Sequence, residues 1–102
     1  MSDETEMIEA LHPDPTKQGQ RVNRAAYEAY RDALLEAIPD TADGIAFGEL
    51  AAAVEVLVPN RIRTTTSPGW WTTTVKLDLE ARGLIERIEG TSRQRVRRTT
   101  SP

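Results

Sequence analysis

The sequence contains no cysteine, a single histidine and no long apolar run. Without cysteine there are no disulfides, thiolate metal sites or cysteine nucleophiles, and His12 alone supplies at most one ligand or base. No segment approaches the ~20 apolar residues that a membrane-spanning helix needs, and the acidic N-terminus is the opposite of the basic start of a signal peptide. We therefore expect a cytoplasmic protein that uses no metal, cofactor or membrane.

The chain of 102 residues is long enough for one small domain. A domain of this size buries roughly 60–70% of its unfolded surface, which is enough to fold without disulfides. Residues 1–20 show no sustained periodicity and contain two prolines. We predict a flexible acidic arm over residues 1–20, a single folded domain over residues 21–98 and a frayed tail over residues 99–102.

The net charge of −3 conceals an uneven distribution along the chain. Residues 1–15 carry a charge of −5, residues 16–58 carry −3, and residues 59–102 carry +5. Such a chain can present a basic surface to an anionic partner although its total is acidic. Most of its basic residues are arginines, which favour bidentate contacts to phosphate or carboxylate. The codon usage of a GC-rich genome explains the same excess of arginine.

A first helix is predicted to begin after Asn23, a favourable N-cap residue, and to end near Ile38, before a proline. Tyr27, Tyr30 and Leu34 recur at helical spacing with Ile38 and form one apolar stripe. This pattern is typical of a core-facing helix. The alternative is that the two tyrosines stack on nucleic-acid bases.

A short strand at residues 45–46 and two further helices are predicted next. The helix over residues 47–58 lacks a side-chain cap, because Ala46 stands where a Ser or Thr hydroxyl would bond. The helix over residues 70–82 ends at Gly83, which we expect in the left-handed conformation.

The connection between these helices, residues 59–69, is too long for the 3–4-residue turn of a simple helix-turn-helix. It either hides a short helical turn or forms an exposed loop that binds something. Beyond the last helix, residues 84–89 and 94–98 are β-prone and flank a turn at residues 90–93. The expected fold is α+β and winged helix-turn-helix-like, with three helices and a C-terminal β-hairpin.

The last predicted helix has apolar residues on two faces. On a helical wheel, Trp71 and Leu79 fall within about 40° of Val75 and form the core-facing stripe. Trp70 and Leu77 fall on the opposite side. An exposed apolar pair of this kind is typical of a partner surface, although the N-terminal arm or the 59–69 connection can also cover it.

In a DNA-binding winged helix, the outward face of this helix would enter the major groove. That face offers Thr73, Lys76 and Glu80 but no Arg, Asn or Gln for bidentate base contacts. Five arginines cluster instead on the hairpin: Arg87, Arg93, Arg95, Arg97 and Arg98. These can contact phosphates without reading sequence. The alternative is that they protect an edge strand from aggregation.

Several core positions resemble those of winged-helix regulators: Glu49-Leu50, Val75, Leu79-Glu80 and Gly83-Leu84-Ile85. Over about residues 8–98 the chain is more closely similar to an uncharacterised family of short bacterial proteins. The elements that carry this second resemblance are Arg21-Val22, Tyr27, Arg31, Leu34, Glu49-Leu50, Val54, Gly69-Trp70-Trp71, Thr74-Val75, Leu77-Asp78-Leu79-Glu80-Ala81 and Gly83. The resemblance implies a stand-alone winged-helix-like domain and nothing catalytic. Ala46 departs from it, because a capping Thr is expected there.

Two functions follow as hypotheses. The first is a nucleic-acid-binding or regulatory module that uses the hairpin arginines, with Lys76 and Thr73 of the preceding helix. The second is a protein-interaction module, most simply a homodimer, in which Trp70 and Leu77 form the contact. We expect no enzyme and no small-molecule substrate, because the sequence has no nucleophile beside a base, no phosphate-binding Gly-rich loop and no metal-ligand spacing.

Overall fold

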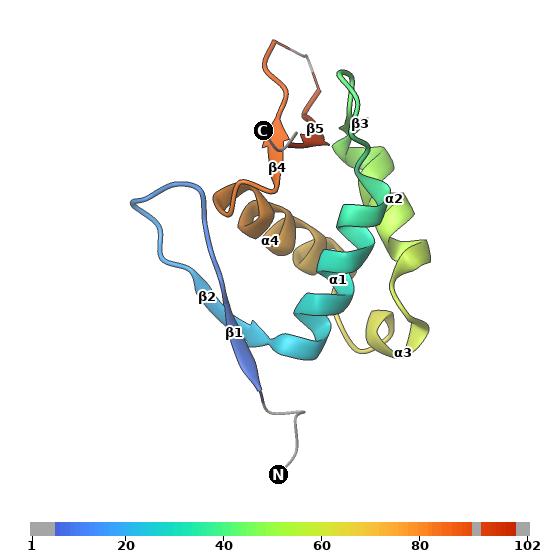
Figure 1. Cartoon of the computed structure of the whole chain (residues 1–102). Coiled ribbons are helices and arrows are strands. Elements are labelled where there is room, and N and C mark those ends of the chain that lie inside the picture. The colour runs from blue at the N-terminus through green and yellow to red at the C-terminus, as the bar shows by residue number, and fades with distance from the viewer. Residues whose placement is uncertain (1–5, 91–92, 100–102) are drawn as a thin grey trace.

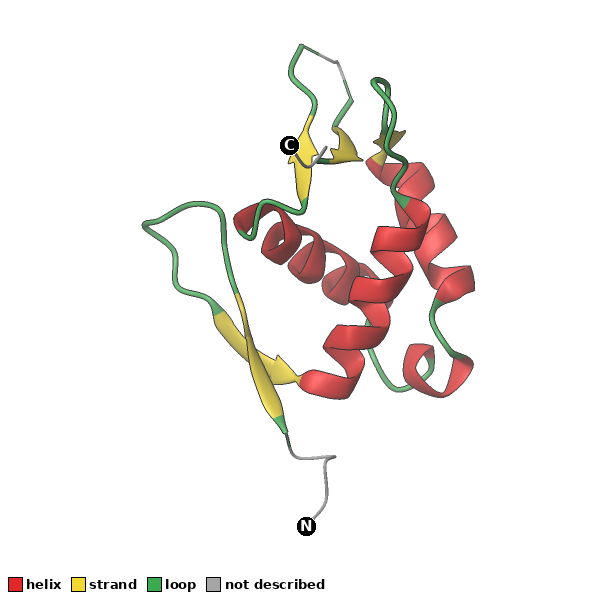
Figure 2. Ribbon diagram, viewed as in Figure 1, coloured by secondary structure: helices red, strands yellow, loops and turns green. Residues whose placement is uncertain are grey.

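Four helices and two small antiparallel sheets form the part of the chain that this computed structural model describes, residues 6–90 and 93–99 (Figure 1). The helices are α1 (Arg24–Ala37), α2 (Phe47–Leu57), α3 (Asn60–Arg63) and α4 (Pro68–Ala81). The strands are β1 (Met7–Ala10), β2 (Gln20–Asn23), β3 (Ile45–Ala46), β4 (Ile85–Arg87) and β5 (Arg95–Arg98). The predicted mixture of helix and strand is confirmed (Figure 2).

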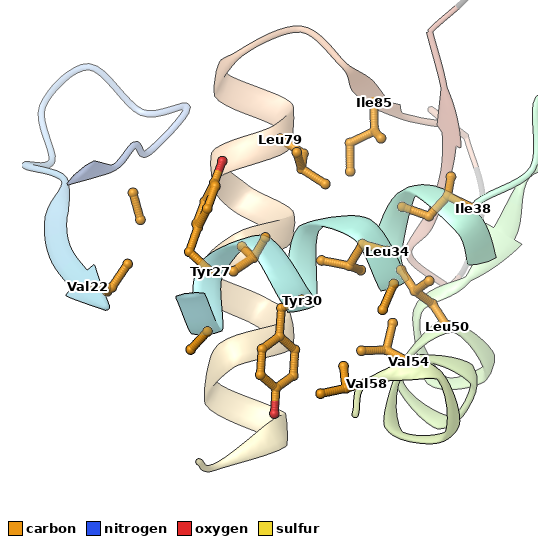
Figure 3. Packing of buried hydrophobic residues seen from close by; sticks show 14 of the residues in the cluster. Val22, Tyr27, Tyr30, Leu34, Ile38, Leu50, Val54, Val58, Leu79 and Ile85 are labelled. Carbon is orange, nitrogen blue, oxygen red and sulfur yellow. The ribbon is translucent and has the colours of Figure 1, made fainter. Parts of the chain in front are cut away.

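Helices α1, α2 and α4 surround the core (Figure 3). The predicted stripe of α1 is buried, because Tyr30, Leu34 and Ile38 are 0% exposed and Tyr27 is 2% exposed. The residues that complete the core from α2, its C-terminal end and α4 are Leu50, Val54, Val58, Val75 and Leu79. The two tyrosines are therefore packing residues, and the alternative that they stack on nucleic-acid bases is wrong.

The ends of the long helices follow local signals in the sequence. The Asn23 side chain accepts a hydrogen bond from the backbone N–H of Ala26 at 2.9 Å, which makes it the predicted N-cap of α1. Ala46 precedes α2 without any side-chain cap, also as predicted. Gly83 has φ 77°, the left-handed conformation expected beyond the end of α4.

The prediction of three helices is wrong, because α3 lies within the connection between α2 and α4. Ile62 anchors this short helix by packing into the core with 8% exposure. Threonine hydroxyls hold its end: Thr64 Oγ1 donates to the Asn60 carbonyl at 2.9 Å, and Thr66 Oγ1 donates to the Ile62 carbonyl at 2.7 Å. Of the two alternatives for this connection, the short helical turn is therefore confirmed. The sequence did not decide between them, because a four-residue helix is too short to display helical periodicity.

The N-terminal segment forms a β-hairpin instead of the flexible arm predicted over residues 1–20. Strand β1 pairs antiparallel with β2, with Ile8 opposite Val22. Ala10 and Val22 are 2% and 5% exposed and belong to the core. The folded domain therefore begins with β1, while residues 1–5 lie outside the described part of the chain. Two four-residue strands are too short for alternation to identify them.

The second sheet has the strand order β3-β5-β4, so that the short strand between α1 and α2 pairs with the last strand. Val96 in β5 is 0% exposed and belongs to the core. The predicted strands 84–89 and 94–98 correspond to the shorter β4 and β5. Within the predicted turn, residues 91–92 lie outside the described part of the chain.

The predicted frayed tail over residues 99–102 is wrong for its first residue. The backbone N–H of Thr99 donates to the Leu84 carbonyl at 3.1 Å, and its hydroxyl donates to the Gly83 carbonyl at 2.7 Å. These bonds tie the end of β5 to the C-terminal end of α4. The rest of the predicted tail, residues 100–102, is not described by the structure.

Candidate functional site

Helix α4 uses one face for the core, as its wheel predicts. Val75 and Leu79 are 0% exposed, and Thr72 is 1% exposed. Trp71 is half-buried and stacks on Tyr30, with ring centroids 5.6 Å apart and planes at 15°. The residues of α4 that remain available to a partner are therefore those outside this core-facing stripe.

Lys76 does not lie on the outward face of α4, where the sequence placed it as a nucleic-acid contact. It is 2% exposed, and its Nζ lies 2.6 Å from Glu80 Oε2 and 5.6 Å from the ring centroid of Phe47. Arg87 approaches the other oxygen of Glu80 at 3.5 Å. Phe47, the first residue of α2, covers Lys76. A helical wheel of α4 cannot predict this contact, because it comes from a different segment of the chain. The assignment of Lys76 as a nucleic-acid contact is wrong.

The predicted partner surface of α4 is only partly exposed. Trp70 is 45% exposed and meets Trp71 edge to face, with centroids 5.4 Å apart. Leu77 is half-buried and lines a cavity of about 50 Å³ with Ala10 of the N-terminal hairpin. Of the two apolar residues, Trp70 is therefore the accessible one. Thr73 is exposed as predicted.

A buried carboxylate in α4 joins this helix to α1 and to the N-terminal hairpin. Asp78 is 0% exposed and accepts hydrogen bonds from the Tyr27 hydroxyl, the Leu11 backbone N–H at 2.7 Å and Arg82 Nε at 2.9 Å. Arg82 also donates to the Glu9 carbonyl at 3.0 Å. The carboxylate therefore connects three elements that are separate in sequence.

The pKa values of two side chains that donate to Asp78, those of Tyr27 and Arg82, are raised. Burial and the hydrogen bond to Asp78 raise the pKa of Tyr27 to about 12. The hydrogen bond to the same carboxylate raises the pKa of Arg82. This network was not predicted from the sequence. The four-residue spacing of Asp78 and Arg82 places them on one helix face and could have indicated an ion pair. The hydrogen bond from Tyr27 could not be predicted in this way, because it depends on the packing of α1 against α4.

Two of the hairpin arginines bind the loop between α1 and β3. Arg95 Nε donates to the Asp43 carbonyl at 2.8 Å. Arg97 Nε lies 2.6 Å from Glu86 Oε2, and its Nη1 donates to the Ala42 carbonyl at 3.2 Å. Arg95 and Arg97 are two residues apart in β5, so both side chains lie on one face of the strand. They fasten the loop to the sheet, a structural role that the sequence did not indicate.

The hairpin arginines differ in how their charge is compensated. Arg87, Arg93 and Arg98 are all exposed, and Arg87 shares Glu80 with Lys76. Among the described residues, no carboxylate lies within ion-pair distance of Arg95 or Arg98. The hairpin therefore retains positive charge at its surface, although less than a count of its arginines suggests.

Neither a group of metal-binding side chains nor a helix that could span a membrane is found among the described residues. No three His, Asp or Glu side chains there lie close enough together to hold a metal ion. No described helix combines the length and apolar character that a membrane span requires.

The fold and these surfaces define a small α+β domain with four helices and two antiparallel sheets among the described residues and a basic C-terminal hairpin. The chain belongs to the family of unknown function DUF6958, which matches residues 7–96. The expectation of an uncharacterised family is confirmed at this level. No curated protein and no solved structure matches the chain.

Proposed function

We propose that this domain is a winged helix in which α4 occupies the position of the recognition helix and β4–β5 form the wing. The order of elements supports the assignment, because β3 lies between the first two long helices and pairs with the last strand of the hairpin. In this view α3 is an insertion in the helix-turn-helix connection, and the β1–β2 hairpin is an N-terminal addition.

We further propose that the module binds the phosphate backbone of nucleic acid through the hairpin and does so without catalysis. The observation that carries this proposal is the unneutralised charge of Arg95 and Arg98 on β5, beside the exposed Arg93. Arginine is well suited to phosphate, because its planar fork of donors matches the phosphate oxygens.

Readout of bases by α4 is a poorer explanation of function than backbone contact. Lys76 is buried, and the N-terminal hairpin lies against Leu77. The exposed side chains that remain are those of Trp70 and Thr73. Neither forms the bidentate contacts that distinguish guanine or adenine.

If Arg93, Arg95 and Arg98 each neutralise one phosphate, log affinity for DNA should fall with log salt at a slope of about −2 to −3. Raising the salt from about 50 to about 200 mM should then weaken binding roughly 20- to 60-fold. A titration of random-sequence duplex DNA at these two concentrations measures this effect.

The matched test replaces Arg93 and Arg98 by glutamine and compares this double variant with Arg21→Gln, Arg63→Gln, which removes the same charge elsewhere. The hairpin variant should weaken binding and reduce the salt slope by about 2, since each phosphate contact contributes about one unit. The control should retain most of the affinity. Equal losses in both variants, or no binding by the wild type at low salt, would contradict the proposal.

The exposure of Trp70 favours homodimerisation as a second candidate function. Buried tryptophan is enriched among the residues that dominate interface energies, and 45% of this side chain is exposed to solvent. We expect the wild type to sediment as a dimer at high concentration and Trp70→Glu as a monomer with unchanged folding. Thr73→Glu adds a charge to the same face as a control. A wild type that remains monomeric would exclude this function.

A further inference from the structure

A cavity of about 430 Å³ lies between the N-terminal end of α1, helix α3 and the beginning of α4. Its volume is in the range of sites that hold small molecules, about 300–1,000 Å³. Trp71, Ile62 and Ala26 contribute its apolar wall, and Arg61 contributes a charged side chain. This end of α1 is remote from the hairpin of the proposed nucleic-acid interface (Figure 1).

The aromatic part of the wall is fixed in orientation by its neighbours. Trp71 stacks on Tyr30, and Trp70 meets it edge to face at 5.4 Å. The Tyr30 hydroxyl lies 2.7 Å from Thr66 Oγ1, which itself donates to the Ile62 carbonyl at 2.7 Å. These contacts hold the indole in place before any ligand arrives, which lowers the entropic cost of binding.

The polar groups of the cavity differ in availability. The Thr66 hydroxyl is engaged within the protein, and so is the Asn23 side chain, which caps α1. Arg61 is exposed, and no acceptor among the described residues binds its guanidinium group. Arg63 in the same helix is different, because it donates to Asn60 Oδ1 at 2.6 Å and to the Glu55 carbonyl at 3.3 Å. Arg61 is therefore the cation that a ligand in this cavity can engage.

We propose that this cavity binds a small aromatic carboxylate, with its ring against Trp71 and its carboxylate on Arg61. Aromatic rings pack against an indole in edge-to-face as well as offset arrangements, so the part of Trp71 that lines the cavity favours a planar ring. The guanidinium fork binds a carboxylate through two parallel hydrogen bonds. The cavity volume suits a ligand of one or two fused rings. The proposed function of this cavity is ligand binding at a site separate from the hairpin. This proposal does not depend on whether the hairpin binds nucleic acid.

Calorimetric titration with 2-naphthoate tests the proposal, with 2-naphthamide as an uncharged probe of the same shape. We expect 2-naphthoate to bind with a Kd of about 1 mM or lower and the amide to bind at least about tenfold more weakly. Arg61→Gln should remove this preference for the carboxylate. Arg63→Gln should retain it, because that side chain does not line the cavity.

Tryptophan fluorescence places the ligand within the cavity. Binding should change the emission of Trp70→Phe, which keeps Trp71, and the affinity of this variant should match that of the wild type. Trp71→Phe should bind 2-naphthoate more weakly. The proposal is overturned if 2-naphthoate shows no binding in the millimolar range, if the amide binds equally well, or if Arg61→Gln and Arg63→Gln have the same affinity.

Discussion

Replacing Asp78 by alanine is expected to lower the free energy of unfolding by about 3 kcal/mol. The substitution removes the acceptor that serves three donors. It leaves the buried hydroxyl of Tyr27 and the part-buried N–H of Leu11 without this partner. Arg82 loses the same partner but is 36% exposed and regains hydration. Because small domains are stable by only about 5–15 kcal/mol, this loss is large. Urea denaturation measures it.

The matched control is Asp32→Ala in α1, where the carboxylate is 71% exposed and pairs with its neighbour Arg31. Its cost should stay within about 0.5 kcal/mol. In Asp78→Ala the pKa of Tyr27 should fall from about 12 while staying above its ordinary value of 10, because burial remains the first cause of its shift. Tyrosinate absorbance follows this titration. Equal stabilities of the two variants would show that the Asp78 network contributes little.

Gly44→Ala should destabilise the protein by about 3 kcal/mol or more, because the new methyl group meets the backbone of β5. A Cβ atom at this position would lie 2.1 Å from the Val96 carbonyl oxygen and 2.8 Å from Ile88 Cδ1. Gly44 also has φ 59°, which is unfavourable for alanine. Relief of the clash requires β3 to move away from β5, and this movement would expose Val96 to water.

Gly83→Ala is the control for Gly44→Ala, because it introduces the backbone strain without the steric clash. Gly83 has a similar φ of 77°, but nothing lies within 4 Å of a Cβ atom built there. Its substitution should cost only about 1 kcal/mol, the penalty for a left-handed conformation. Urea denaturation of both variants gives the difference, which we expect to be about 2 kcal/mol or more in favour of Gly83→Ala. A difference near zero would contradict the close approach of Gly44 to β5.

Features encoded by neighbouring residues could be predicted from the sequence. Asn23 caps α1 through a bond to a residue only three positions away, and Gly83 ends α4 through its own conformation. The buried stripe of α1, which includes Tyr30 and Leu34, follows from helical spacing alone. The short strand containing Ala46 was likewise predicted from local residues.

Features that depend on contacts between distant segments could not be predicted in the same way. Lys76 is polar and lies away from the core stripe, yet Phe47 and Glu80 bury it. Two alternatives were left open for Leu77, exposure or cover by the N-terminal arm, and the N-terminal hairpin partly covers it. The sequence did not decide between them, because nothing in β1 indicates that the strand packs against α4. Arg95 binds a loop that precedes it by some fifty residues. The surface predicted on α4 therefore included residues that are buried or partly covered. Arg95 and Arg97 of the hairpin also have a structural role, because they bind the loop between α1 and β3.

The central claim is that the hairpin contacts phosphates while α4 does not read bases. The most direct test measures the affinity of the wild-type protein for two duplexes of unrelated sequence across a range of salt concentrations. We predict equal affinities for the two duplexes, with a slope of log affinity against log salt of about −2 to −3 for both. A strong preference for one duplex that is lost in Thr73→Ala but retained in Arg98→Gln would contradict this account.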